Sequence, residues 1–571
     1  MTPVETATPV RASTAALTIA PHSAATEEQK PSPMVNGRAW IACGILLLVF
    51  GIYALSSPGR IDIVDGEARY DVAFNWVING RPIMSDSWII PFMAVRGRGG
   101  FHYSYFGAPA SFFALPLVWA GMYSNNPQFL FSMVSPFFGA AVAPILFLLY
   151  LELGLNRRRA LAWTLVSSFA SYLWAISDSS FDNAQHAFFT VAAVYFGVLS
   201  ARRKSPLLAA LGGAMVGVLF AYQEYFLLLV PALALVTLAG SARSGDRGDE
   251  TRWLTLRCAR YLRAAWNGPG EERSACIRYF VFAAAVGLGV MLSLAYNHLR
   301  FGSWLDDGKV RFAAHRGYNF FGDPLAGLLT LLVSPGKSVL LYSPTLVLAV
   351  LGARGLARRN AQLAAAIAVA TVFLVLFLSC ISFVGGDWCW GPRYLTPLLP
   401  LWALAFPFVA EGKYKRPLVV GAVALSFLVQ ALALSVETQR FFFEHRLHDF
   451  FWAEDSWFYF KHSALWSRLG EVATLPQGPP ASATKFNSIP DPDWTTYTVL
   501  GQPRPIPRSM APVWMRQFQI FYLPRPWPLW VPRLREEIQP VSPIAWLGGL
   551  GGILLLGTCF LYRGFQSPEF P

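Results

Sequence analysis

The segment that decides the fold is Trp40–Leu55, which reads WIACGILLLVFGIYAL. It carries no charged residue, and it begins too far into the chain to be an ordinary cleaved signal peptide. We therefore expect a retained first membrane helix. The preceding residues 1–37 are rich in Ala, Thr, Ser and Pro and contain no apolar run, which predicts a disordered, cytoplasmic N-terminus.

The composition of the whole chain agrees with a membrane protein. Of 571 residues, 54% are hydrophobic and only 14% are charged, and the mean hydropathy is +0.41. Soluble domains carry roughly 25% charged residues, so a cytosolic protein is excluded. The net charge of +13 accompanies no nucleic-acid recognition module, and we expect no nucleic-acid partner. The six Cys show no CxxC pair, which argues against a disulfide framework or a zinc site.

Apolar runs recur along the chain and predict an all-α polytopic fold with about twelve transmembrane helices. After Trp40–Leu55 the expected spans are roughly 127–151, 160–176, 185–200, 206–222, 225–240, 277–297, 338–353, 361–384, 394–410, 417–435 and 543–562. If the N-terminus is inside, every basic cluster beside a span falls on that same face, as the positive-inside rule requires. These clusters are 157–159, 202–204, 241–275, 354–359, 413–416 and Arg563. We expect a plasma (inner) membrane protein with its N-terminus in the cytoplasm.

Three units follow from this topology. Residues 38–435 form the transmembrane module, and its first outer loop is 57–126. Residues 436–542 are long and rich in Pro and Trp, which predicts an extracytoplasmic segment or small domain. Residues 543–571 supply the last transmembrane helix and a short cytoplasmic tail.

The first outer loop gathers acids in the stretch 62–71, which reads DIVDGEARYD. Helical spacing after Gly66, ended by Gly80, predicts a short helix lying along the membrane interface. Asp65 and Glu67 would lie at its N-terminus, where the helix dipole favours their ionised forms. A carboxylate there could accept a proton from a hydroxyl nucleophile, and ordinary helix capping is the alternative.

Aromatic and basic residues mark the other outer loops. The rings of His102, Tyr103 and Tyr105 suit a sugar or lipid cleft, although an aromatic belt would look the same. Lys337 follows a Pro-Gly break and could contact a phosphate or extend to the membrane surface; Leu331 stands where a phosphate-binding loop needs Gly. A smaller acidic group, at 178–186, could contribute to a site or face water.

The loop 385–393 ends at Arg393, an ionisable group at the start of an apolar helix. Its guanidinium matches phosphate oxygens, and a structural pair with Asp387 is the alternative. Asp387 and Trp390 are further candidates for the cleft. Acids and cations on an outer face, away from soluble nucleotide sugars, indicate group transfer from a membrane-borne donor such as a sugar on a polyprenyl phosphate.

These residues resemble those of the GT-C superfamily of membrane glycosyltransferases, which includes protein O-mannosyltransferases and lipid A aminoarabinose transferases. Four segments within about residues 40–410 carry the resemblance: Asp65–Tyr70, Tyr103–Pro109 leading to Ala114–Pro116, Leu332–Lys337 with Leu341–Pro344, and Gly385–Asp387 with Gly391–Pro397. The resemblance implies an inverting transfer from a lipid-phosphate-linked sugar with a first-loop Asp as base. Carried over, Asp65 is the base, and Glu67 is the alternative.

We therefore expect a glycosyltransferase that moves a sugar from a polyprenyl-phosphate donor to a hydroxyl of a cell-envelope glycan, lipid or protein. Asp65 would activate the acceptor, and Arg393 with Lys337 would stabilise the departing phosphate. The sequence shows no metal-ligand set, so no cofactor is required in this scheme, although a divalent metal could assist. A secondary transporter of a small polar or lipid-linked solute and a non-catalytic, lipid-binding scaffold are the alternatives.

Overall fold

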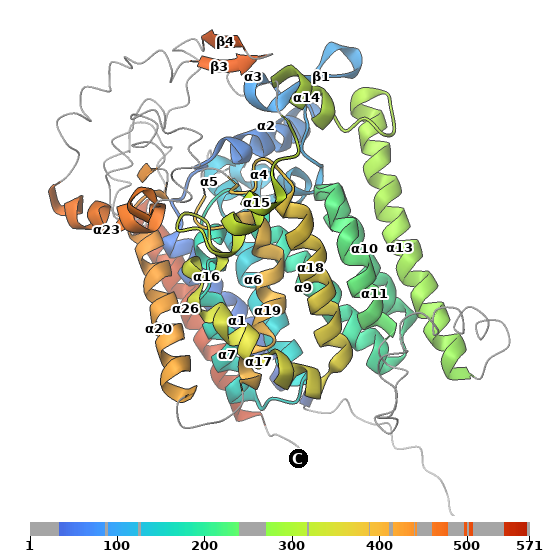
Figure 1. The fold of residues 1–571 in the computed structure, drawn as a ribbon, viewed down its shortest axis with the longest axis vertical. Coiled ribbons are helices and arrows are strands. Elements are labelled where there is room, and N and C mark those ends of the chain that lie inside the picture. The colour runs from blue at the N-terminus through green and yellow to red at the C-terminus, as the bar shows by residue number, and fades with distance from the viewer. Residues whose placement is uncertain are drawn as a thin grey trace, which may run out of the picture.

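The computed structural model describes residues 34–85, 90–123, 127–238, 270–316, 319–386, 389–409, 415–438, 440–441, 460–477, 496–499, 502–505 and 542–567. The described chain is mainly helical, as expected (Figure 1). The long helices are α1 (Met34–Ser56), α6 (Val134–Glu152), α9 (Asn183–Arg203), α13 (Gly270–Phe301), α18 (Ala361–Ser379), α20 (Lys415–Ser435) and α26 (Pro543–Gln566).

Shorter helices fill the spaces between the long ones and cover one end of the bundle. Those of intermediate length are α2 (Val64–Asn79), α4 (Pro109–Tyr123), α7 (Arg157–Phe169), α10 (Pro206–Tyr222), α11 (Val230–Leu238), α17 (Val347–Arg359) and α23 (Ala464–Thr474). The shortest are α3 (Ile90–Met93), α5 (Pro127–Ser132), α8 (Leu173–Ser177), α14 (Lys309–Arg316), α15 (Pro324–Leu332), α16 (Val339–Tyr342) and α19 (Leu399–Ala403).

Single 3₁₀ turns and two small antiparallel hairpins complete the described chain. The turns are η1 (Arg98–Gly100), η2 (Glu224–Leu229), η5 (Pro344–Leu346), η6 (Arg393–Leu398), η7 (Phe406–Phe408), η8 (Phe460–His462) and η9 (Leu475–Gln477). The hairpins pair β1 (Ala94–Arg96) with β2 (His102–Ser104), and β3 (Thr496–Val499) with β4 (Gln502–Pro505).

Seven helices among the described residues are long and apolar enough to cross a membrane. They match seven of the predicted spans, and two further predicted spans, 206–222 and 225–240, coincide with shorter apolar helices. The remaining three, 160–176, 338–353 and 394–410, are each divided into short helical pieces. Proline explains two of these divisions, since Pro344 and Pro397 lie inside the predicted runs and cannot donate a backbone hydrogen bond. The total of twelve spans stays a prediction.

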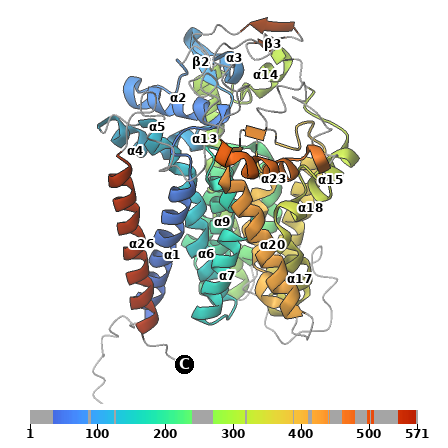
Figure 2. The same ribbon diagram turned by 90° about the vertical axis from the view of Figure 1, so that its left-hand side faces the viewer.

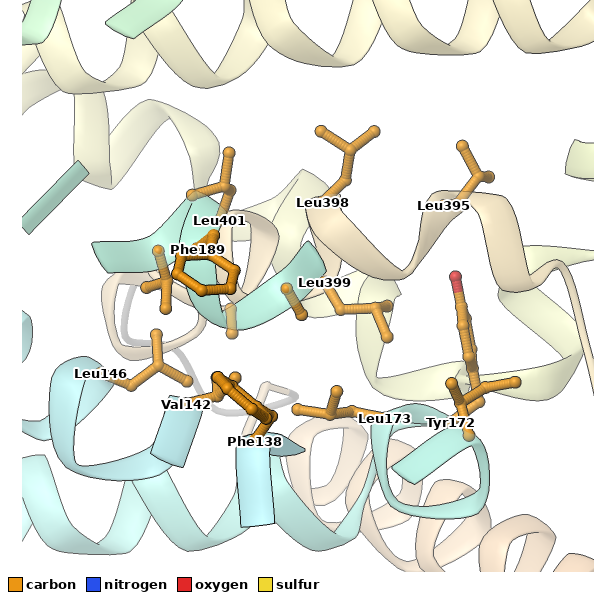
Figure 3. Packing of buried hydrophobic residues seen from close by; sticks show 14 of the residues in the cluster. Phe138, Val142, Leu146, Tyr172, Leu173, Phe189, Leu395, Leu398, Leu399 and Leu401 are labelled. Atoms are coloured by element: carbon orange, nitrogen blue, oxygen red, sulfur yellow. The ribbon is translucent and has the colours of Figure 1, made fainter. Parts of the chain in front are cut away.

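The hydrophobic core lies where α6 and α9 pack against the broken segment η6–α19. In Figure 3, Leu399 of that segment lies toward Phe138 and Val142 of α6, whereas Leu395 and Leu398 point away from them. The apolar stretch of α9 is 83% buried, whereas that of α26 is only 11% buried. Helix α9 is therefore central, and α26 presents most of its apolar surface outward, beside α1 (Figure 2).

The basic clusters gather at one end of the bundle. Arg157 on α7 donates to the carbonyl of Ser567 at the end of α26, at 2.9 Å, and Arg359 of α17 donates to the carbonyl of Leu153, just after α6, at 2.8 Å. Helix α2 lies across the opposite end of the bundle (Figure 2). Arginine-rich helix ends and the acidic α2 therefore occupy opposite ends of the molecule.

Of the predicted domains, residues 1–33 and most of 436–542 lie outside the described residues. The described part of the latter includes α23, which packs on the end of α20. Arg468 of α23 is fully buried and donates to the carbonyl of Val436, at 2.5 Å. Close by, Glu437 forms a buried ion pair of 3.0 Å with Arg60 of the first loop. These contacts attach α23 to the end of the bundle where α2 lies.

Candidate functional site

Helix α2 positions the acidic motif. It begins at Val64, so Asp65 and Glu67 occupy its first turn, and it ends at Asn79 with Gly80 as a left-handed C-cap at φ 64°. The predicted helix and its stop at Gly80 are thus present. Residues four apart share one face of a helix, which places Asp65 and Arg69 together. Glu67 is half-buried and lies about 200° around the helix from Asp65.

Asp65 meets Arg393 at this end of the bundle. The Arg393 Nη1 lies 3.0 Å from the Asp65 Oδ2, although the two residues are 328 positions apart in the chain. The Arg393 side chain is 10% exposed and that of Asp65 is 15% exposed. Arg393 also donates to the hydroxyl of Tyr394 at 3.1 Å and stacks over the ring of Phe181 at 4.0 Å. The structure therefore brings together an acid and a cation predicted from separate loops.

The loop before Arg393 is shaped to let this side chain approach. Gly386 has φ 69°, and a Cβ there would lie 2.7 Å from the Arg393 Cγ, so a larger residue would collide. The buried Lys337 donates its Nζ to the carbonyl of Cys389, at 2.8 Å, and so helps to hold the same loop. Trp390 is buried edge-on against Tyr342, with ring centroids 5.0 Å apart. Asp387, another predicted cleft residue, lies outside the described residues.

A second ion pair lies one turn along α2. The Arg69 Nη2 is 2.8 Å from the Asp182 Oδ2, and both side chains are buried. The Nε2 of His186 is 3.5 Å from the same oxygen. Burial opposes ionisation of Asp182, but the charge of Arg69 and then the neighbouring His186 outweigh it and hold the pKa of Asp182 well below its usual range.

The sequence does not predict this second pair. The stretch 178–186, which contains Asp182 and His186, indicates only a small acidic group, and Arg69 is only one residue of the first-loop motif. The one usable signal was the spacing of Asp65 and Arg69, which puts an acid and a cation on one helix face. The partner of Arg69 lies more than a hundred residues away in sequence, so its identity could not be read from the motif.

The structure explains why a glycine, Gly66, stands between the two acids of the motif. A Cβ at this position would lie 2.6 Å from the Ser180 Cβ and 3.1 Å from its carbonyl oxygen. The first turn of α2 therefore rests directly on the segment that precedes α9. That close approach sets the depth at which Asp65 and Arg69 reach Arg393 and Asp182.

Two other acids of the stretch 62–71, Asp62 and Asp71, have structural partners. Asp62 is buried and accepts hydrogen bonds of 2.8 Å from the hydroxyl of Ser179 and the backbone N–H of Ser180. Burial, and then the charge of Glu437, raise the pKa of Asp62. Asp71 accepts from the backbone N–H of Ser85 at 2.9 Å and so anchors the turn after α2. Asp65 is therefore the acid of the motif whose partner is the Arg393 side chain.

The predicted aromatic residues lie on or next to a hairpin that a different arginine, Arg300, holds in place. Tyr103 on β2 packs edge-on against Phe301, and the ring of Tyr105 lies 4.2 Å from that of Phe312. His102 is half-buried and pairs through its backbone with Arg96 of β1. Arg300 donates to the carbonyls of Ser104 and Phe106, which holds this hairpin against α13. The hairpin reaches the two ion pairs through Phe106, whose ring lies 4.2 Å from the Arg69 guanidinium.

No known family model matches the chain, and no curated protein resembles it at a significant level. Within the described ranges, no three or more His, Cys, Asp and Glu side chains come close enough to hold a metal ion together.

Proposed function

We propose that the protein is an integral membrane glycosyltransferase that uses a sugar linked to a polyprenyl phosphate. The observation that carries the proposal is the contact between Asp65 and Arg393 at the end of the bundle opposite the basic clusters. A carboxylate base and a phosphate-binding cation are the two groups this transfer needs, and here they are adjacent. The resemblance to GT-C enzymes supports the same assignment.

In the proposed reaction, Asp65 and Arg393 have separate roles. An acceptor hydroxyl oxygen attacks the anomeric carbon, and the bond between that carbon and the phosphate oxygen breaks. The electron pair leaves with the polyprenyl phosphate, whose negative charge Arg393 stabilises. The hydroxyl proton passes to the Asp65 carboxylate, and attack from the face opposite the phosphate inverts the anomeric configuration. The products are the glycosylated acceptor and the free polyprenyl phosphate.

The Asp65–Arg393 ion pair implies that the donor binds before Asp65 can act as a base. Before the donor binds, Asp65 and Arg393 neutralise each other at 3.0 Å. The donor phosphate competes with Asp65 for the guanidinium, because both are anions that accept hydrogen bonds from it. Binding of the donor therefore frees Asp65 to act as a base. Lys337 contributes by holding the Cys389 loop that presents Arg393.

The orientation in the membrane is part of the proposal. The end of the bundle that holds Arg157, Arg202 and Arg359 would face the cytoplasm, in keeping with the positive-inside rule. Helix α2 would then lie at the outer interface of the plasma membrane, where the phosphate of a polyprenyl donor resides. Acceptors on that side are cell-envelope glycans, lipids or proteins.

The test is the Asp65→Asn variant of the full chain in detergent. We expect transfer from a panel of labelled undecaprenyl-phosphate sugars to fall by about 10²–10⁴-fold, the usual contribution of a general base. The same variant should bind undecaprenyl phosphate at least as tightly as the wild type, because Asp65 no longer competes for Arg393. A parallel loss of both properties, or full transfer activity in the variant, would refute the base assignment. A transporter or scaffold would show no transfer with any donor.

A further inference from the structure

A small cavity lies beside the Arg69–Asp182 ion pair and is not used by the proposed transfer step. It has room for about one water molecule. The residues that line it come from α2, α4, α5, α6 and α9 and from the turn before α9; they are Arg69, Ala110, Phe131, Val134, Ser135, Ser180, Phe181, Asp182 and Gln185. Charged and polar side chains thus form a large part of its wall.

Several of these polar atoms lack a partner within the protein. Among the described residues, the Nε and Nη1 of Arg69 and the Oγ of Ser135 have no hydrogen-bond partner, although both side chains are about 97% buried. A buried donor left unsatisfied costs about 1–3 kcal/mol. The N–H groups of these two nitrogens and a hydroxyl, all on residues that line one cavity, therefore favour an oxygen atom as its occupant. Asp182, on the same wall, can accept a hydrogen bond in return.

The position of the cavity relates it to the reacting atoms. Arg69 follows Asp65 by one helical turn, about 6 Å along α2. Phe181, which lines the cavity, is also the ring on which Arg393 stacks. A sugar that reaches Asp65 and Arg393 therefore lies about one helical turn from this wall.

We propose that the cavity receives a hydroxyl group of the transferred sugar and so selects the donor; this inference rests on the proposed function. A sugar hydroxyl both donates and accepts, which matches a wall that offers the Asp182 carboxylate and the free N–H groups of Arg69. A site built to bind a hydroxyl discriminates strongly against a donor that lacks it or directs it elsewhere, because its own polar groups are then left unpaired. Arg69 and Asp182 are thus specificity-determining residues.

The test uses a variant whose side chain fills the cavity and leaves both ion pairs in place. In Ser135→Val two methyl groups replace the unpartnered hydroxyl, and Arg69 and Asp182 stay unchanged. Binding to the full-length protein in detergent is measured for undecaprenyl phosphate and for its mannosyl, glucosyl, galactosyl and arabinosyl derivatives. We expect the wild type to prefer one sugar and Ser135→Val to bind that derivative about tenfold or more weakly, because the sugar hydroxyl that the added methyl groups displace loses a hydrogen bond to the charged Arg69 guanidinium. Undecaprenyl phosphate, the matched control without a sugar, should bind both proteins within about twofold.

Other outcomes separate this inference from the proposed function. If Ser135→Val weakens all probes equally, or weakens none, the cavity holds only a buried water and the inference is overturned. The same conclusion follows if the wild type binds no sugar derivative better than the bare lipid phosphate. Arg393→Gln tests the proposed function independently: it should abolish binding of undecaprenyl phosphate, and unchanged binding would overturn the assignment of the phosphate site and this inference with it.

Discussion

The Asp65–Arg393 and Arg69–Asp182 pairs beside α2 are buried, whereas the Arg202–Glu152 pair at the opposite end of the bundle reaches solvent. Arg69 and Asp182 are 3% and 7% exposed. At the other end Arg202 pairs with Glu152, and the Arg202 side chain is 57% exposed. Both regions pair an arginine with a carboxylate across a long stretch of sequence. They differ in how much water the charges have lost.

The difference in solvent exposure changes what an ion pair contributes to the free energy of folding. An exposed pair contributes about 0–1 kcal/mol, because water screens the attraction. A buried pair costs desolvation energy that its attraction only balances, so it adds little net stability over apolar packing. The proposed function accordingly assigns the Asp65–Arg393 and Arg69–Asp182 pairs to contacts with a ligand, whereas the equally buried Arg60–Glu437 pair joins two segments of the chain. The basic end fits the membrane-topology signal of its arginines.

The largest effect on stability is expected from breaking the Arg69–Asp182 ion pair. Arg69→Met leaves the Asp182 charge buried without its partner, and we expect a loss of about 3–5 kcal/mol in the free energy of unfolding. The double variant Arg69→Met/Asp182→Leu should regain most of that stability by apolar packing, yet lose the preference of the wild type for one sugar donor. Thermal unfolding in detergent and transfer assays with each donor on the same samples measure both properties. If the double variant keeps the wild-type sugar preference, the pair has no role beyond structure.

The pH dependence should follow the same pair with a smaller amplitude. The depressed pKa of Asp182 means that its contribution to stability is fully present above the unfolded value of about 3.9 and is lost as the pH falls through the folded value. Unfolding should therefore become easier as the pH drops from about 5 toward about 3. The double variant, which lacks Asp182, should have a flatter profile. Identical profiles for the two proteins would show that Asp182 is not the titrating group.

A moderate effect is expected at the contact that seats α2. Gly66→Ala places a methyl group against Ser180 and should cost about 1–3 kcal/mol by overpacking, with lower transfer because Asp65 is lifted from Arg393. Gly421→Ala on α20 is the matched control, since no atom lies within 4 Å of its added Cβ. There the substitution should be neutral or stabilise by up to about 1 kcal/mol. Equal behaviour of the two variants would mean that the close approach at Gly66 does not matter.

The smallest effect is expected at the basic end. Arg202→Ala removes an exposed pair and should change the free energy of unfolding by no more than about 1 kcal/mol. Transfer activity should stay at the wild-type level, because the residue lies at the opposite end of the bundle from Asp65. A large loss of activity in this variant would contradict the assignment of the transfer reaction to the end of the bundle where α2 lies.

Sequence patterns predicted the parts that depend on nearby residues. The helix that carries Asp65 and stops at Gly80 follows from local spacing and from a glycine that accepts φ 64°. The membrane-length helices follow from uninterrupted apolar runs. The pattern was less informative at 338–353 and 394–410, where apolar composition continues across prolines that divide the helix. Hydropathy measures how apolar a segment is. It carries almost no information on the backbone hydrogen bonds that a proline removes.

The sequence by itself determined that this is a helical membrane protein with basic and acidic residues segregated between loops, because apolar length and charge act locally along the chain. Only the tertiary structure decided that Asp65 meets Arg393, that Arg69 meets Asp182, and that Lys337 supports a neighbouring loop instead. Partners so distant in sequence are chosen by how the helices pack and by where a glycine lets two backbones approach. A single sequence records the side chains that can pair, but not the geometry that selects which of them do.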